Sequence, residues 1–259
     1  MALVIGTNIA SLNAQRHLSA SQNKSAVAME RLSTGMRINT GQDDGAGLAI
    51  GSTLGAKVRG LNQAVRNAND GVSMAKTADA ALAEVGNMLE RMRELATENV
   101  NGALSGTDKT NITNELTALN TEIGNIQTNA KFNNVGLLSA TVLASFQVGE
   151  ASADIYSFNV NAGTLTVTSN LNVASIEAMI GNVTSARASF GQAATALESR
   201  AANSAALAEN MTAARGRIMD ADIAQETANM TKASVLQQAG IAVLAQANQA
   251  PNMVLSLLR

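Results

Sequence analysis

Paired acidic residues beside glycines are the first candidates for chemistry in this sequence. Asp43 and Asp44 precede Gly45-Ala46-Gly47, which could supply two carboxylates for acid–base catalysis or a backbone loop around a phosphate. No Lys-Ser or Lys-Thr follows, as a phosphate-binding P-loop requires, and the glycines lack the G-x-G-x-x-G spacing. We therefore predict a helix cap, with acidic side chains near the positive end of the helix dipole.

Two other groups of side chains could bind ions or move protons. Asp220 and Asp222 lie close to Arg215 and Arg217, and no loop glycine with a distal Glu completes a calcium-ligand set, so the pattern favours a charge cluster on a helix surface. His17 is the single histidine of the chain and has no cysteine or suitably placed serine to activate. We predict that it is a surface or interface residue.

The remaining charged motif is the run Glu90, Arg91, Arg93 and Glu94, which by itself is typical of a solvated helix face. With no Cys and one His, the chain has no disulfide, thiolate nucleophile, zinc cluster or multi-histidine metal site. We expect no catalytic residue, no metal and no cofactor, so the chain is predicted not to be an enzyme.

Charge and hydropathy exclude further classes of function. The 18 Lys and Arg against 20 Asp and Glu give a net charge of -2, far from the basic surface that nucleic acids select. No apolar run approaches the roughly 20 residues of a membrane span, and the N-terminus lacks the features of a secretory signal peptide. We expect a soluble, uncleaved chain that could still leave the cell by another route, without membrane insertion.

The composition favours long helices as the elements that position these residues. Hydrophobic residues make up 46% of the chain but aromatic residues only 2%, and there is a single Pro. Such a core must be built from aliphatic side chains and Met, which suits long helices packed on small residues.

Three heptad patterns locate these helices. From Leu61 to Ala96 every seventh residue is Leu or Ala, and a companion row shifts after Val72, so we predict one continuous helix over 58–96. A second heptad runs over 183–221, interrupted at Arg200 and Ser204, where we expect a locally weaker helix interface that sets register. A shorter heptad covers 112–130. The three stripes can share one bundle, so the predicted fold is mainly α, a long-helix coiled-coil bundle.

The segment from about Thr141 to Asn170 differs in composition. Residues 142–148 and 155–168 are rich in Val, Thr, Phe and Ile, with turn signals at Gly149 and at 161–163. We predict one or two β-hairpins there.

The two ends of the chain carry apolar residues on more than one helical face. A solvated helix needs only one such face, so these ends must meet several neighbours, and in a short chain those neighbours are other copies. We expect the ends to be disordered in a free monomer and to fold when neighbours cover them. The residues predicted to carry self-assembly are Ile5, Ile9, Leu12, Leu18, Leu32, Met230, Leu236, Ile241, Leu244, Leu255 and Leu258.

The chain resembles bacterial flagellin. The motifs that carry the resemblance lie at both ends and in the middle of the chain: 7–16 (TNIASLNAQR), 31–39 (RLSTGMRIN), 43–50 (DDGAGLAI), 59–71 (RGLNQAVRNANDG), 132–134 (FNN), 146–149 (FQVG), 218–222 (IMDAD), 226–232 (ETANMTK), 237–240 (QQAG), 244–249 (LAQANQ) and 254–258 (VLSLL).

The resemblance implies a structural subunit of the bacterial flagellar filament, in a minimal form without the outer variable domains. It implies that residues 1–43 and 221–259 form paired terminal helices in the inner layer of the filament, that 44–140 and 171–220 form a long-helix rod, and that 141–170 form the β-hairpin region of that rod. The subunit would be exported unfolded, secreted to the extracellular filament and polymerised through its ends for swimming motility. Implied partners are other copies of the chain, an export chaperone, the filament cap and hook-junction proteins.

The resemblance also implies a contact with the flagellin-sensing Toll-like receptor. Arg91, Leu95 and Glu115 match the positions concerned, and the surrounding stretch adds Leu89, Glu90, Arg93 and Glu94.

Two other functions fit parts of the pattern. A hook-to-filament junction protein has similar ends, although its opening usually differs from Ser11-Leu12-Asn13-Ala14-Gln15-Arg16. A membrane-active secreted helical protein could use the apolar C-terminus.

Overall fold

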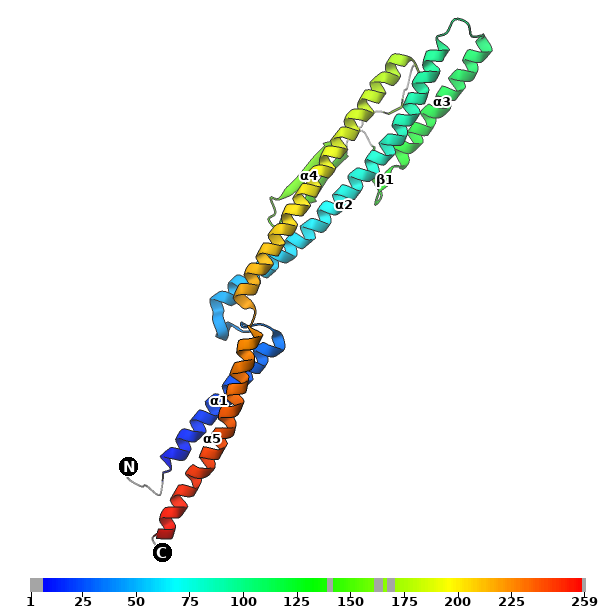
Figure 1. The fold of residues 1–259 in the computed structure, drawn as a ribbon. Coiled ribbons are helices and arrows are strands. Elements are labelled where there is room, and N and C mark those ends of the chain that lie inside the picture. Colours follow the sequence, from blue (N-terminus) through cyan, green and yellow to red (C-terminus); the bar gives the residue numbers. More distant parts are fainter. Residues whose placement is uncertain (1–6, 139–141, 161–164, 167–170, 258–259) are drawn as a thin grey trace. The chain divides into compact units, whose positions relative to one another are not determined.

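The computed structural model describes residues 7–138, 142–160, 165–166 and 171–257, without the side chains of 250–257 (Figure 1). The chain forms two compact units, one of residues 1–55 with 211–259 and the other of residues 56–210. Within the described ranges, no helix combines the length and hydropathy that crossing a membrane requires.

The first unit is built on two antiparallel helices, α1 (Ile9–Thr34) and α5 (Ile223–Leu257), which lie side by side (Figure 1). Asn8 caps α1 by accepting a hydrogen bond from the Ser11 N–H, and Gly35 ends it with a left-handed φ of 71°, donating its own N–H to the Arg31 carbonyl. Two backbone hydrogen bonds then tie the chain after α1 to the chain before α5, from Arg37 N–H to Met219 O and from Ala221 N–H to Gly35 O.

The second unit contains most of α2 (Gly41–Asn99), all of α3 (Gly106–Asn129) and most of α4 (Val173–Met219). The continuous helix predicted over 58–96 is confirmed, and the 112–130 and 183–221 heptads lie on α3 and α4 except for their last residues, 130 and 220–221. Inside α2 the backbone is non-helical at Asp44, where φ is -165°, so the long helical run begins after that residue. A capping box between Ser105 and Asp108 starts α3.

The core of this unit follows the predicted heptads. The residues of α2 spaced by seven, Leu61, Ala68, Ala75, Leu82, Leu89 and Ala96, are all buried, as are the shifted companions Ala78, Val85 and Met92. On α4 the small residues Ala186 and Ala193 alternate with Val183, Phe190 and Leu197 in the same core. The shift after Val72 therefore marks a real change in which side of α2 faces its neighbours.

A β-hairpin forms where the sequence predicts one. β3 (Val142–Gln147) pairs antiparallel with β4 (Ile155–Val160), in the register Val142 opposite Val160. A second small hairpin, β1 (Lys131–Phe132) with β2 (Val135–Gly136), was not predicted; Asn133 and Asn134 turn it with φ of 47° and 66°. Most of the region expected for a further hairpin, 161–164 and 167–170, lies outside the described residues.

Aromatic rings fasten the β3–β4 hairpin to α4. The Phe158 ring centroid lies 6.1 Å from those of Phe146 and Phe190, stacked on the first and edge-on to the second. Farther along α4, the Arg200 guanidinium lies 4.9 Å from the centroid of the Tyr156 ring, and the buried Ser204 hydroxyl donates a hydrogen bond to the Val148 carbonyl at 2.9 Å.

These contacts show what Arg200 and Ser204 do in the structure, and the weaker helix interface expected there stays a prediction. Both side chains contact the hairpin, so the polar residues in the heptad mark where α4 changes partner.

Candidate self-assembly surface

The acidic pair at the start of α2 caps helices, as predicted. The Asp44 carboxylate accepts the Gly47 N–H at 2.9 Å, and Asp43 accepts the N–H groups of Asn39 and Thr40 and the Thr40 hydroxyl. These hydrogen bonds hold the pKa of Asp43 below its usual range, with the largest contribution from Thr40 and a smaller one from Asn39. The positive charge of Arg31 lowers the same pKa further. Both carboxylates are engaged in local structure and are not free to act as an acid–base pair.

The second acidic pair has a different role from the one predicted. Asp222 accepts the N–H groups of Ala224 and Gln225, which makes it the cap of α5. Arg215, Arg217, Asp220 and Asp222 are all exposed, as a surface charge cluster requires, but no ion pair joins these residues to one another among the described residues. The sequence signal for the cap was present, because Asp222 directly precedes the apolar run that starts at Ile223.

His17 is exposed on α1. No group of three or more His, Cys, Asp or Glu side chains within the described ranges could hold a metal ion.

The contact between α1 and α5 is made chiefly by small and polar residues. On α1 the positions facing α5 follow a heptad, and so do those on α5; all are buried or half-buried. Leu18 packs on Gly240, 3.5 Å from where a β-carbon would be. We call these residues the seam: Ser11, Ala14, Leu18, Ser21, Ser25, Ala28 and Leu32 on α1, and Glu226, Met230, Ala233, Gln237, Gly240, Leu244 and Ala247 on α5.

Polar side chains fix the register of the seam. The Ser21 hydroxyl donates to the Ala233 carbonyl at 2.8 Å, and the Ser11 hydroxyl donates to the Asn248 amide oxygen at 2.8 Å. The Asn8 amide donates to the Ala247 carbonyl. Sequence reasoning missed these residues because it followed large apolar side chains, although serines at heptad spacing were a usable signal.

At the other end of the seam, Arg31 joins three segments. Its guanidinium lies 3.1 Å from a Glu226 carboxylate oxygen on α5 and 3.6 Å from Asp43 in the first turn of α2. The Asn229 amide donates to the other Glu226 oxygen. Glu226 is thus a buried acid with partners for both oxygens, which is the condition under which burying a charge is tolerated.

The large apolar residues of the helix pair divide into two groups. Leu18, Leu32, Met230 and Leu244 occupy seam positions and hold the pair together. Ile9, Leu12, Leu236 and Ile241 point outward, with exposed fractions of 65%, 50%, 50% and 58%. We call the latter four, with the similarly exposed Val27, Met29, Ile223, Val235 and Val243, the outward face. Ile5 and Leu258 lie outside the described residues, as does the side chain of Leu255.

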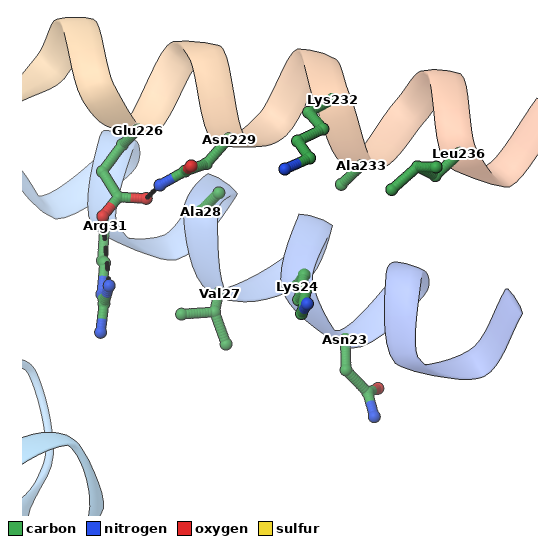
Figure 2. Close-up of a pocket in the computed structure, with 10 residues that line it drawn as sticks. All are labelled: Asn23, Lys24, Val27, Ala28, Arg31, Glu226, Asn229, Lys232, Ala233 and Leu236. Carbon is green, nitrogen blue, oxygen red and sulfur yellow. Dashed lines mark hydrogen bonds and ion pairs between the residues drawn. The ribbon is translucent and has the colours of Figure 1, made fainter. Parts of the chain in front are cut away.

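A groove of about 450 Å³ lies between the two helices on this unit (Figure 2). Apolar Val27 and Leu236 flank it, and Lys24 from α1 and Lys232 from α5 both line it. Its other lining residues are Asn23, Ala28, Arg31, Glu226, Asn229 and Ala233.

The predicted receptor-contact residues lie at one place on the second unit, in two environments. Arg91 donates hydrogen bonds to Glu94 at 3.1 Å and to Glu115 on α3 at 3.2 Å, and these contacts raise its pKa. Leu89 and Leu95 are 0% and 2% exposed, because they belong to the heptad core of α2. Only the charged members, which include the exposed Glu90 and Arg93, are presented on the surface.

Comparison with known proteins identifies relatives along the whole chain. Residues 5–142 match the family model of the bacterial flagellin N-terminal helical region, and residues 173–258 match that of the bacterial flagellin C-terminal helical region. Flagellin of Halalkalibacterium halodurans is 37% identical over 272 residues, covering 99% of this chain and 100% of the relative. The flagellar filament 33 kDa core protein of Treponema phagedenis is 34% identical over 286 residues, with 99% and 100% covered.

Among solved structures, the crystal structure of Bacillus cereus flagellin is similar, with 28% identity and a TM-score of 0.42. The match covers 56% of this chain and 88% of that one.

Proposed function

This chain belongs to the bacterial flagellin family, and we propose that it polymerises through the outward face of its α1–α5 pair. It is a structural subunit of the bacterial flagellar filament, which serves motility, and not an enzyme. No observation favours a junction protein or a membrane-active protein.

One observation carries the proposal: the fully buried residues of the helix pair are mostly Ala and Ser, four larger apolar residues are half-buried in the seam, and the large apolar residues of the outward face are exposed. Fully burying a Leu or Ile side chain contributes about 1.5–3 kcal/mol, whereas the Ala and Ser of the seam contribute far less. The outward face therefore holds most of the burial free energy that these helices can gain. This free energy is gained when other copies of the chain cover the outward face. Repeated head-to-tail contacts between copies produce an open helical fibre.

Substitutions on the outward face test the proposal. Leu12→Ser and Ile241→Ser remove exposed apolar surface without touching the seam, so purified full-length chain carrying either change should retain its helix content and lose salt-induced polymerisation. Val100→Ser is the control, because Val100 is 74% exposed on the turn after α2. Fibres of normal length and yield from both outward-face variants, seen by electron microscopy, would contradict the proposal.

The proposal extends to the layers and the export of the subunit. Residues 1–43 and 221–259 would form the inner layer, 44–140 and 171–220 the rod, and 141–170 its hairpin region. A chain with no Cys has no disulfide to break before passing unfolded through an export channel to the outside of the cell. The expected partners are an export chaperone, the filament cap and hook-junction proteins, and co-purification from flagellated cells tests each.

We further propose that the charged cluster of Glu90, Arg91, Arg93, Glu94 and Glu115 contacts the flagellin-sensing Toll-like receptor. The support is its exposure and the Arg91 bridge between α2 and α3. Arg91→Ala should weaken binding of the monomer to the receptor ectodomain by about tenfold, the effect of losing roughly 1.4 kcal/mol. Arg187→Ala is the control, because it removes a similar bridge, to Asp79, elsewhere on the same unit. Equal losses in the two variants would contradict a specific contact.

A further inference from the structure

Two lysines in the groove between α1 and α5 have no acidic partner. No carboxylate of a described residue lies within 4 Å of the Lys24 or Lys232 ammonium group. The acid that lines the groove is Glu226, but its two oxygens are already bound by Arg31 and Asn229. The groove therefore presents two uncompensated positive charges between apolar walls (Figure 2).

The helix pair itself contains one acid that could compensate these charges. The acidic residues in the described parts of α1 and α5 are Glu30 and Glu226. Glu226 is engaged as above, whereas Glu30 is exposed and takes part in no ion pair with a described residue. Four more acids lie near the segments that connect to this helix pair, and they are less suitable partners for the lysines. Asp43, Asp44 and Asp222 accept backbone N–H groups, and Asp220 lies between the end of α4 and the start of α5.

Glu30 is not one of the residues that line the groove of its own molecule. It lies six residues after Lys24 on α1, which places the two about 120° apart around the helix at roughly 100° per residue. Glu30 and Lys24 therefore project from α1 in different directions. Two different, complementary faces on one subunit are what a contact between identical copies needs if it is to repeat without closing into a dimer.

We propose that the groove receives Glu30 of a second copy of this chain, with Lys24 and Lys232 binding its carboxylate. The inference rests on the proposed polymerisation through the helix pair and names the polar contact that directs it. Burial of the outward face, including Val27 and Leu236 beside the lysines, favours association but does not determine how two copies are oriented. The ion pair fixes which side of one pair meets which side of the next, because a wrong alignment would bury the lysines without a partner.

Charge reversal tests the pairing on purified full-length chain. We would measure the critical concentration for growth from wild-type fibre seeds, by sedimentation, for the variants K24E/K232E, E30K and the combined K24E/K232E/E30K. R16E is the control, because Arg16 is an exposed cation of α1 outside the groove. Far-UV circular dichroism of each monomer checks that the helices are retained.

K24E/K232E and E30K should each raise the critical concentration about tenfold or more, because each places like charges opposite one another. The combined variant should return to within about threefold of the wild type, and R16E should stay within the same range. Wild-type behaviour of K24E/K232E or of E30K overturns the pairing, and so does failure of the combined variant to recover. If the pairing is overturned in this way, the wild-type chain should still polymerise and the Leu12→Ser variant should not. The proposed function is therefore judged separately from the pairing.

Discussion

Four aspartates of this chain bind its own backbone. Asp43, Asp44, Asp108 and Asp222 all accept N–H groups at the starts of helices, where these groups have no partner within the helix. For long helices that carry few tertiary contacts near their ends, such caps decide where the helix begins. They also give a structural role to acidic pairs that resemble catalytic or metal-binding motifs.

The cap at Asp44 makes the first prediction. Asp44→Ala removes the acceptor of the Gly47 N–H and should lower the free energy of unfolding by about 1 kcal/mol. Asp44→Ser keeps an oxygen at the cap and should lose less than half of that amount. Urea unfolding followed by circular dichroism measures both, and an equal loss in the two variants would show that the cap is not the cause.

Asp43 makes a prediction for acid pH. Its folded pKa is lowered, by the Thr40 and Asn39 hydrogen bonds and then by Arg31, so the folded chain favours the ionised carboxylate. The resulting stabilisation is present above about pH 4, the ordinary pKa of Asp, and is lost as the pH falls towards the lower folded pKa. In Asp43→Asn the thermal midpoint should therefore be lower than that of the wild type at pH 7, and the difference should shrink below pH 4. A difference that is constant from pH 7 to pH 3 would refute this assignment.

At the scale of elements, two glycines of α2 give opposite predictions. A β-carbon on Gly71 would lie 2.8 Å from the Leu197 δ-carbon and 3.1 Å from the Phe146 ring, so Gly71→Ala should destabilise the chain by about 1–3 kcal/mol through overpacking. At Gly86 the nearest atom would be 3.9 Å away, on Val183, so Gly86→Ala should stabilise it by about 0.5–1 kcal/mol. Thermal unfolding compares the two. Changes of the same sign would mean that α2 does not approach α4 and the hairpin as described.

The helices could be predicted from sequence because each presents the same kind of residue to its neighbours for many turns. The seven-residue spacing from Leu61 to Ala96 is such a signal, and burial follows it throughout. The β1–β2 hairpin was missed because its strands have two residues each, too few to show alternation. Its signal is the Asn133-Asn134 pair, since asparagine tolerates the positive φ that a two-residue turn requires.

The candidate surface was only partly predictable for a related reason. Leu12 and Leu18 look alike in sequence, yet one is exposed and the other lies on the seam. Their sorting depends on where α5 packs, and that is set by Ser11, Ala14 and Ser21, which a search for large apolar residues passes over. The partners of Arg31 and the pairing of Arg91 with Glu115 likewise require contacts between segments distant in sequence.

Considered as whole bodies, the two units differ in what holds them together. The unit of residues 56–210 has a core of Leu, Ile, Met and Phe that is closed within the chain. The α1–α5 pair buries mainly Ala and Ser and leaves its outward face to solvent. We therefore expect the second unit to be stable alone and the terminal helices to depend on neighbouring copies for their stability, which would link their folding to polymerisation by mass action.

Hydrogen exchange should reveal this difference directly. In a dilute monomer, amides of α1 and α5 should exchange about a hundredfold faster than those of α2 and α4 in the second unit, because opening the helix pair exposes little buried apolar area. In the polymer the terminal amides should become as protected as those of the rod, since neighbouring copies then cover Leu12, Ile241 and the rest of the outward face. Mass spectrometry of the monomer and of fibres made from the same preparation measures both states. Terminal helices that are already fully protected in the monomer would show that the small-residue seam stabilises them unaided, and the dependence of their folding on other copies would have to be abandoned.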